Sequence, residues 1–284
     1  MDDFTIATDD TTTLLSSFAA ISAAAGRDEF RRQTERHRQR VRAIAETGIE
    51  SGTTIADALR HASNREPDRL VDKVKYTPIR DAAALPTLDG PLSSSGLSVR
   101  GGPYDFEWTD RENFAFLTAE HDTGLMEISL DSGSNMSSDH AWGGAGIGIR
   151  YTTKRTTKFV RVAPYLSYSY RWSNDSTLEV ARNRGTVSVL VRERSGKLEL
   201  DSRTSLWNDG TGWYESHSDD VDDVFTDSRW FFARPETEYE IWFWFDASID
   251  FNHETSGFLD FGSSRASCSL GALLRWIVIE EFGS

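Results

Sequence analysis

Residues 238–251 read Glu-Tyr-Glu-Ile-Trp-Phe-Trp-Phe-Asp-Ala-Ser-Ile-Asp-Phe, and the alternation in this stretch decides the fold class. Side chains of a strand point alternately to its two faces, so the odd-numbered residues, Tyr239 to Phe251, form one continuous apolar face that must be buried. The even-numbered residues form a polar face, interrupted by Trp242 and Trp244 at about 7 Å spacing. The stretch is predicted to be a long strand with one face in a core.

The same period of two continues through most of the chain after Pro103, with turn-rich segments between the runs. No helix of useful length interrupts these runs, which favours antiparallel pairing. Pro164, inside the longest run, indicates a sheet edge or a bulge because proline cannot donate to a ladder. We predict a mainly β fold, an antiparallel β-sandwich of jelly-roll-like type, with an N-terminal α-helical region. The predicted strands are 113–119, 124–130, 146–152, 158–172, 185–192, 198–202, 229–233, 239–251 and 266–281.

Four regions follow from the composition and the hydrophobic period. Residues 1–13 are rich in Thr and Asp and are predicted to be a flexible arm, and residues 14–76 show helical spacing of apolar side chains. Residues 77–103 carry Pro, Gly and Ser and are predicted to be a linker. Residues 104–284 are predicted to form the β-sandwich domain.

The charge of the chain disfavours two classes of partner. The 284 residues include 31 basic and 45 acidic ones, a formal net charge of -14, so nucleic acid and anionic membranes are disfavoured as default partners. Residues 1–99 hold 13 of the basic and 15 of the acidic residues, so the acidity lies in the second part. The single cysteine excludes an intramolecular disulfide framework. The N-terminus shows no signal-peptide pattern, so we expect a cytoplasmic protein, or one exported without an N-terminal signal peptide.

Trp242 and Trp244 have two interpretations. Planar aromatic rings at this spacing can stack on sugar rings while Glu240 and Asp246 hydrogen-bond the hydroxyls. The carboxylates of this strand, set against carboxylates of a neighbouring strand, also leave glycoside cleavage open. The other interpretation, which we favour, is that the helical region packs over this face and the tryptophans anchor it, because two exposed tryptophans without a ligand form an uncovered apolar patch.

An acidic run at residues 218–227 offers oxygen ligands for a hard cation such as calcium. The run lacks the glycine turn and the terminal glutamate of an EF-hand loop, so a solvated acidic loop is the favoured interpretation. No other cofactor is expected. The candidate ligands are Asp219, Asp220, Asp222 and Asp223.

Residues 27–42 carry seven arginines against three acidic residues and form the one basic island of the chain. Arg31 and Arg38 are the candidate partner contacts in it. Self-complementarity with the acidic sheet domain, in the same chain or in a neighbouring copy, is favoured over nucleic acid as the role of this island.

The glycines of residues 143–148, in Trp-Gly-Gly-Ala-Gly-Ile-Gly, do not indicate a phosphate-binding loop, because the chain continues as a strand and not as a helix. A glycine-kinked strand or a close sheet contact is the better interpretation.

No nucleophile elbow, P-loop or dinucleotide fingerprint is present in the sequence. The leading hypothesis is therefore a non-enzymatic binding or assembly protein that contacts a protein partner or other copies of itself through the basic helical arm and the acidic sheet domain. The alternatives are a carbohydrate-binding or carbohydrate-cleaving β-sandwich, and a membrane-active, pore-forming β protein.

Overall fold

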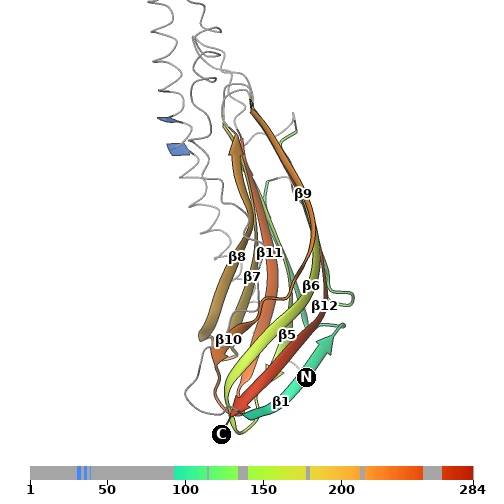
Figure 1. Ribbon diagram of the computed structural model, residues 1–284, viewed down its shortest axis with the longest axis vertical. Coiled ribbons are helices and arrows are strands. Elements are labelled where there is room, and N and C mark those ends of the chain that lie inside the picture. The colour runs from blue at the N-terminus through green and yellow to red at the C-terminus, as the bar shows by residue number, and fades with distance from the viewer. Residues whose placement is uncertain are drawn as a thin grey trace, which may run out of the picture.

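A computed structural model gives the structure of the chain (Figure 1). It describes residues 31, 32, 35, 36 and 39, and residues 93–283 except 114, 134–139, 177–179, 212–214 and 252–263. The described part after residue 92 forms strands joined by turns. The strands are β1 (Ser93–Gly101), β2 (Phe106–Glu112), β3 (Ala115–Glu120), β4 (Leu125–Asp131), β5 (His140–Thr152), β6 (Thr157–Ser176), β7 (Ala181–Glu193), β8 (Leu198–Thr211), β9 (Glu215–Phe225), β10 (Arg229–Phe232), β11 (Glu238–Asp250) and β12 (Ser264–Gly283).

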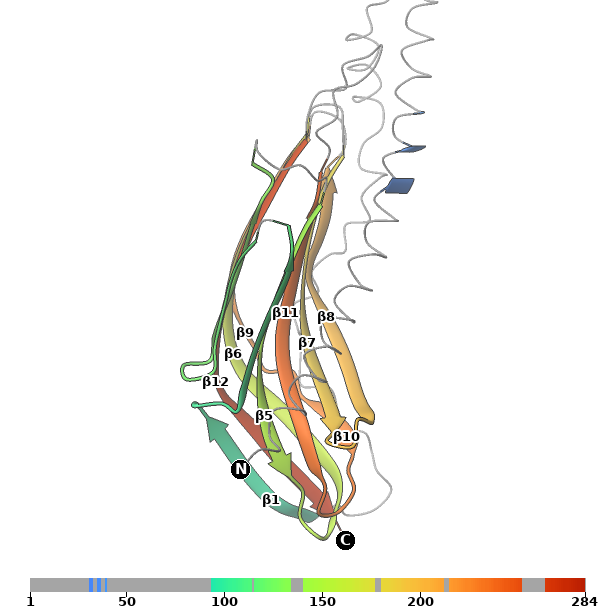
Figure 2. The ribbon, with the colours of Figure 1, turned by 180° about the vertical axis from the view of Figure 1, so that it is seen from behind.

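These strands form two sheets, and every pairing between them is antiparallel. Sheet A has seven strands in the order β10-β6-β12-β4-β3, with β1 also paired to β12 and β9 also paired to β6. Sheet B has five strands in the order β2-β5-β11-β7-β8. The two sheets form two layers (Figure 2), and the predicted β-sandwich is confirmed.

The chain repeatedly crosses from one sheet to the other. It passes from β4 in sheet A to β5 in sheet B, to β6 in sheet A, and to β7 and β8 in sheet B. It then returns to β9 and β10 in sheet A, crosses to β11 in sheet B and reaches β12 in sheet A. β11 therefore lies between β5 and β7, and β12 lies between β6 and β4, so both pair with strands that are distant in the sequence.

β6 and β12 each pair with two different strands, one after the other, along one of their edges. The edge of β6 pairs with β10 at residues 159–162 and with β9 at residues 166–176. Pro164 lies between these ranges, so its missing N–H costs no ladder bond on that edge. Across from it β12 has a bulge between Leu274 and Trp276, where its partner changes from β4 to β1. The sequence prediction of an edge or a bulge at Pro164 is confirmed.

The core lies between the sheets and follows the predicted alternation. The odd-numbered residues of β11 all belong to this core, together with the buried residues of β6 from Val160 to Trp172. Cys268 of β12 is also buried there, and burial raises the pKa of its thiol. Both faces of β11 are buried, however, so its even-numbered residues are not a solvent-exposed polar face.

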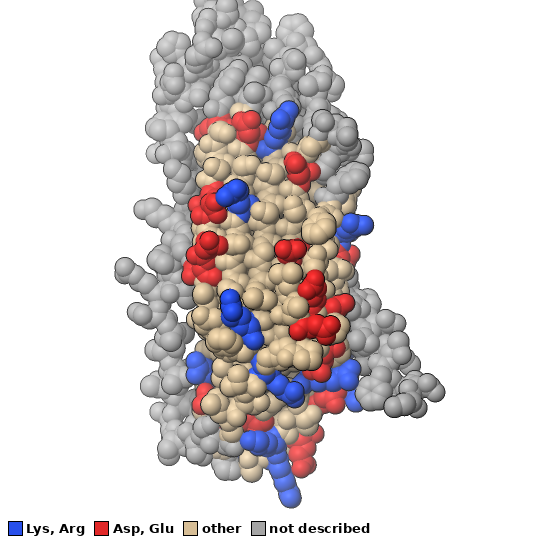
Figure 3. All heavy atoms as spheres, turned by 90° about the vertical axis from the view of Figure 1, so that its right-hand side faces the viewer, with Lys and Arg blue, Asp and Glu red and all other residues tan. Residues whose placement is uncertain are grey.

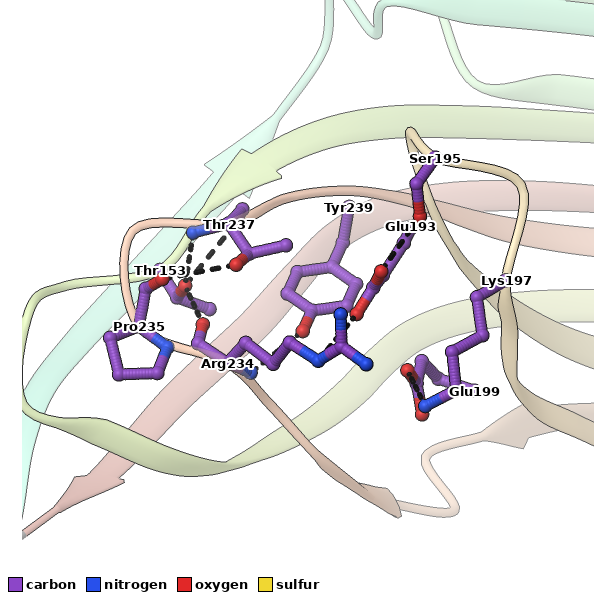
Figure 4. Close-up of polar contacts among 9 residues, drawn as sticks. All are labelled: Thr153, Glu193, Ser195, Lys197, Glu199, Arg234, Pro235, Thr237 and Tyr239. Carbon is purple, nitrogen blue, oxygen red and sulfur yellow. Dashed lines mark hydrogen bonds and ion pairs between the residues drawn. The ribbon is translucent and has the colours of Figure 1, made fainter.

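One end of the sandwich is closed by polar contacts among three turns (Figure 4). The Thr153 hydroxyl donates a hydrogen bond to the carbonyl of Arg234 (2.6 Å) and accepts one from the N–H of Thr237 (3.0 Å). The guanidinium of Arg234 pairs with Glu193 (3.4 Å), whose other oxygen accepts a bond from the Ser195 hydroxyl (2.8 Å). These contacts join the turns after β5, β7 and β10.

The sandwich begins before the predicted boundary at residue 104. β1 lies within the range predicted to be a linker, yet it pairs with β12 as part of sheet A. Of the predicted helical region, the structure describes five residues, all helical, with Gln39 Nε2 donating to Glu35 Oε1 (2.9 Å) one turn away. The remainder of residues 1–92 lies outside the described residues, so the helical region and the arm stay predictions.

Candidate binding surface

The outer face of sheet A carries an exposed group of aromatic and aliphatic side chains on β1, β12, β6 and β10. They point away from the core because they alternate with the buried residues of the same strands. We call this surface the aromatic face. It consists of Leu97, Val99, Phe159, Arg161, Ala163, Tyr165, Trp230, Phe232, Trp276, Val278, Glu280 and Phe282.

Three ring pairs order the aromatic face, two between side chains of neighbouring strands and one between β10 and β12, which lie on either side of β6. Tyr165 and Trp276 are stacked, with ring centroids 4.3 Å apart and planes at 15°. The rings of Phe159 and Phe232 lie 4.7 Å apart. Packing across strands limits the freedom of these rings, so they form a firm surface. The third pair joins Trp230 and Phe282 at 5.0 Å.

One ion pair lies within the aromatic face. Arg161 of β6 and Glu280 of β12 are cross-strand neighbours, and Nη1 lies 3.4 Å from Oε2. The Arg161 guanidinium also lies 6.0 Å from the ring centre of Trp230. Both charged side chains stay partly exposed, 34% for Arg161 and 23% for Glu280. A partner can therefore reach both charges.

Several members of the aromatic face are open to solvent. Phe232 is 73% exposed, Leu97 68%, Val99 60% and Trp276 40%. The other half of the same sheet face differs, because there β6 and β12 present small polar residues such as Ser169 and Ser269. Figure 3 shows this side of the molecule, where uncharged surface fills much of the area, with acidic side chains on either side of it and Lys and Arg side chains across its lower part.

The predicted ligand-binding pair lies on the opposite side of the sandwich, on the outer face of sheet B. Trp242 and Trp244 are both fully buried there, in a cluster separate from the main core. Trp242 stacks on Phe106 of β2 at 5.3 Å, and Trp244 meets Trp108 edge to face at 5.7 Å. The cluster consists of Phe106, Trp108, Trp142, Leu190, Trp242 and Trp244.

The glycines of β5 make room for these rings. A methyl group built on Gly148 would lie 2.7 Å from the Trp242 ring, and one on Gly146 would lie 2.8 Å from Trp244 Cβ. A methyl group on Gly144 would lie 2.7 Å from the ring of Trp108. These glycines lie in a strand, as the sequence predicts, and the close neighbours that require them are tryptophan side chains of the same sheet.

The carboxylates of the predicted site lie at the two ends of this tryptophan cluster. Glu240 is opposite Arg192 on β7 and Arg150 on β5, and it is buried. Asp246 is fully buried opposite Thr186. Burial raises the pKa of Asp246, while Arg184, the Thr186 hydroxyl and Arg203 act in the opposite direction. The structure therefore brings the four predicted residues onto one face, with both rings covered.

The acidic run forms edge strand β9 and not a loop. Alternation along β9 separates Asp219 and Asp223 from Asp220 and Asp222, which point to the opposite face of sheet A. Arg171 on β6 pairs with Asp220 at 2.6 Å. Within the described ranges, no group of three or more His, Cys, Asp and Glu side chains is placed to hold a metal ion.

Of the predicted partner contacts, Arg31 is exposed on the described helical residues. Arg38 lies outside the described residues. No helix of the described part is long and apolar enough to span a membrane.

The aromatic face was not singled out in the sequence, although a signal for it exists. In residues 158–172 the outward positions, which alternate with the core residues, include Phe159 and Tyr165. A solvent-exposed sheet face is normally polar, so large aromatic residues at these positions are the signal. In residues 266–281 the pattern shifts by one residue after Arg275, which hides the outward positions of Trp276 and Val278 until the bulge is known.

Comparison with known proteins finds no matching family model and no matching curated protein. A structure of infectious bursal disease virus, Gx strain, is 12% identical, with a TM-score of 0.22, and the match covers 72% of this chain and 41% of that chain. TmCBM61 in complex with β-1,4-galactotriose is 7% identical, with a TM-score of 0.21 and coverage of 61% and 86%. The enzymatically active domain of bacteriophage CBA120 tailspike protein 4 is 11% identical, with a TM-score of 0.18 and coverage of 55% and 18%. The chain thus spans less than half the length of the viral chain, and TM-scores this low support no assignment of function.

Proposed function

We propose that this chain is a non-enzymatic binding or assembly protein, built on a jelly roll, which contacts a protein partner or other copies of itself through the aromatic face. The observation that carries the proposal is the set of exposed rings and aliphatic side chains at Phe232, Trp276, Leu97 and Val99.

An uncovered apolar surface is costly in water. A single exposed leucine is ordinary, but a contiguous patch with a polar surround marks an interaction site. Aromatic side chains and arginine are also the residue types that contribute most to protein interfaces. The aromatic face has six aromatic rings, one arginine and one glutamate, so its composition is that of the centre of an interface and not of a solvated sheet.

The strand order supports the jelly-roll part of the proposal. Setting aside the added strands β1, β2, β3 and β10, sheet A reads β4-β12-β6-β9 and sheet B reads β5-β11-β7-β8. Two four-stranded antiparallel sheets with the chain crossing between them are the arrangement of the jelly roll. In this arrangement the loops and the two outer sheet faces are available for contacts.

A photo-crosslinking experiment tests the proposed function. A benzoylphenylalanine is incorporated in place of Phe232, and separately in place of Phe116, a 63% exposed phenylalanine on the same sheet face but outside the aromatic face. We expect irradiation of cells that produce the protein to give a discrete crosslinked protein from position 232 and much less from position 116. Mass spectrometry identifies the product. Equal or absent crosslinking at the two positions would overturn the proposal.

Glycan binding is a second candidate, supported by one observation. The rings of Tyr165 and Trp276 are stacked and nearly parallel, and Trp276 stays 40% exposed, so it offers an aromatic ring of the kind that stacks on a sugar face. A tryptophan fluorescence titration against a glycan panel tests it, with Trp276→Ala as the variant expected to lose the response. Trp242→Ala tests the buried pair in the same assay. No response from the wild-type chain would dismiss glycan binding at either pair.

A further inference from the structure

We infer that the partner of the aromatic face is a second copy of this chain, bound face to face about a two-fold axis, with Arg161 of each copy against Glu280 of the other. This inference rests on the proposed function, because it names the partner of the same surface.

The charge pattern of the aromatic face is self-complementary. Its two charged residues are one cation and one anion on neighbouring strands, 3.4 Å apart. In a two-fold symmetric interface, if Arg161 of the first copy contacts Glu280 of the second, then Glu280 of the first copy contacts Arg161 of the second. The interface therefore holds two Arg161–Glu280 contacts. The Arg161–Glu280 ion pair within each chain is then replaced by, or shared with, the two ion pairs between the chains. The interface therefore buries no unpaired charge.

The rest of the chain disfavours other ways for two copies to meet. Each chain carries a formal net charge of -14, so most surfaces repel their counterparts. One free edge of sheet A, at β9, carries Asp219, Asp220, Asp222 and Asp223, which oppose edge-to-edge pairing of strands there. The aromatic face is neutral when its one ion pair is counted, so two copies approach there with the least repulsion.

The size of the face predicts a weak association. Four strands about 4.8 Å apart and seven residues at about 3.4 Å give a surface about 20 Å on each side. That is about 400 Å² in projection, below the roughly 800 Å² per partner of a standard stable interface. Interfaces below the standard size belong mostly to weak or transient complexes, so we expect a dissociation constant on the order of 10 μM or weaker.

Salt separates this contact from the charge-driven one predicted from the sequence. Two chains of charge -14 repel at long range, whereas the contact is apolar apart from two short-range ion pairs, which salt screens less. Added salt should therefore mainly screen the repulsion and strengthen a dimer through the aromatic face. Association of the basic residues 27–42 with an acidic strand of another copy should weaken with salt, because there the screened interaction is attractive.

The decisive experiment mixes two charge-reversal variants. Arg161→Glu places two glutamates at each contact of its own dimer, and Glu280→Arg places two arginines there, so each variant alone should associate at least about tenfold more weakly than wild type. In an equimolar mixture each contact of a heterodimer joins opposite charges. One contact joins the two substituted side chains, at positions 161 and 280, and the other joins the unsubstituted Glu280 and Arg161, so a heterodimer should form. Sedimentation velocity with one variant fluorescently labelled measures it. If the variants dimerise weakly only because each has lost the Arg161–Glu280 ion pair within its own chain, mixing the two variants would not restore dimerisation.

Two further measurements define the outcomes. Phe232→Ser should weaken the wild-type dimer about tenfold or more, whereas Phe116→Ser should leave it unchanged, and circular dichroism checks that both variants keep the fold. A wild-type chain that stays monomeric at about 300 μM and high salt, or a mixture without heterodimer, would overturn the second copy as partner. If position 232 still crosslinks to a different protein, the proposed function stands without this inference. If it crosslinks to nothing, both fall.

Discussion

The indole ring of Trp242 lies so close to Gly148 that a methyl group on the glycine would come within 2.7 Å of the ring. Gly148→Ala should therefore force the ring or the strand to move and destabilise the protein by about 1–3 kcal/mol. Gly271→Ala is the matched control, because the nearest atom to its added methyl group is 3.8 Å away, and it should be neutral or slightly stabilising. Urea denaturation of both variants measures the difference. Equal effects would show that the ring does not depend on the glycine.

Asp246 should make the protein less stable at neutral pH than it is at mildly acidic pH. Burial raises the folded-state pKa of this carboxyl above the unfolded value, so the folded state holds the proton more tightly. The cost of the buried charge is present above the folded pKa, falls as the pH drops through it and is absent once both states are protonated. Asp246→Asn should stabilise the protein at pH 7.5 because it removes the buried charge. This stabilisation should become smaller as the pH is lowered.

Asp250→Asn is the control for the Asp246 variant. Asp250 lies four residues after Asp246, on the same face of β11. Asp250 is buried against His140, with Oδ1 2.6 Å from Nδ1, so its carboxylate has a partner to lose. We expect this variant to destabilise the protein at pH 7.5 by about 1–3 kcal/mol. Guanidinium denaturation at pH 7.5 and 5.5 compares the two variants. The Asp246 prediction fails if both variants destabilise equally.

The contacts at the end of the sandwich should depend on one hydroxyl. Thr153→Val removes the bond donated to the Arg234 carbonyl and the bond accepted from the Thr237 N–H, which leaves both backbone groups without that partner (Figure 4). We expect a loss of about 1–3 kcal/mol in thermal or chemical denaturation. Thr237→Val removes only an exposed bond to the carbonyl of Pro235 and should cost less than about 0.5 kcal/mol. A similar loss in both variants would contradict this role of Thr153.

The thiol of Cys268 should be unreactive in the folded protein. The side chain is buried in the core and burial raises its pKa, so the thiolate that reacts with alkylating reagents is scarce and shielded. Iodoacetamide should label it only in denaturant. Labelling in native buffer at a rate similar to that of the unfolded chain would mean that β12 opens readily.

His121 should titrate above its ordinary range. A hydrogen bond from Nδ1 to Glu107 Oε2 (2.7 Å) raises the pKa of His121, with a smaller contribution from the charge of Asp122. Glu107→Gln should bring the value back toward that of a free histidine. An NMR titration of the imidazole measures it, and an unchanged value in the variant would contradict the pairing.

The strands with clear alternation could be predicted from the sequence, and all nine predicted strands correspond to strands of the structure. Those with weak local signals could not. β9 is rich in aspartate, which has low β-propensity, and it forms because the long edge of β6 supplies its partner. β1 reads as a Ser- and Gly-rich linker, and its strand conformation comes from pairing with β12.

The surfaces were harder to predict than the strands. Alternation placed Trp242, Trp244, Glu240 and Asp246 on one face, but it could not show that this face is buried like the opposite one. For the aromatic face the difficulty was the bulge at Arg275. It reverses which residues of β12 point outward, so Trp276 and Tyr165 become neighbours only in the folded register.

The position of β12 has a consequence for how the protein is made. It is the last described strand in chain order, yet it lies inside sheet A and pairs with β6, β4 and β1. A chain that ends before Ser264 leaves those three strands without their shared neighbour, so sheet A cannot assemble during synthesis until β12 has left the ribosome. Truncation before Ser264 should therefore prevent sheet A from forming, and until β12 emerges the nascent chain exposes strand edges of the kind that favour aggregation.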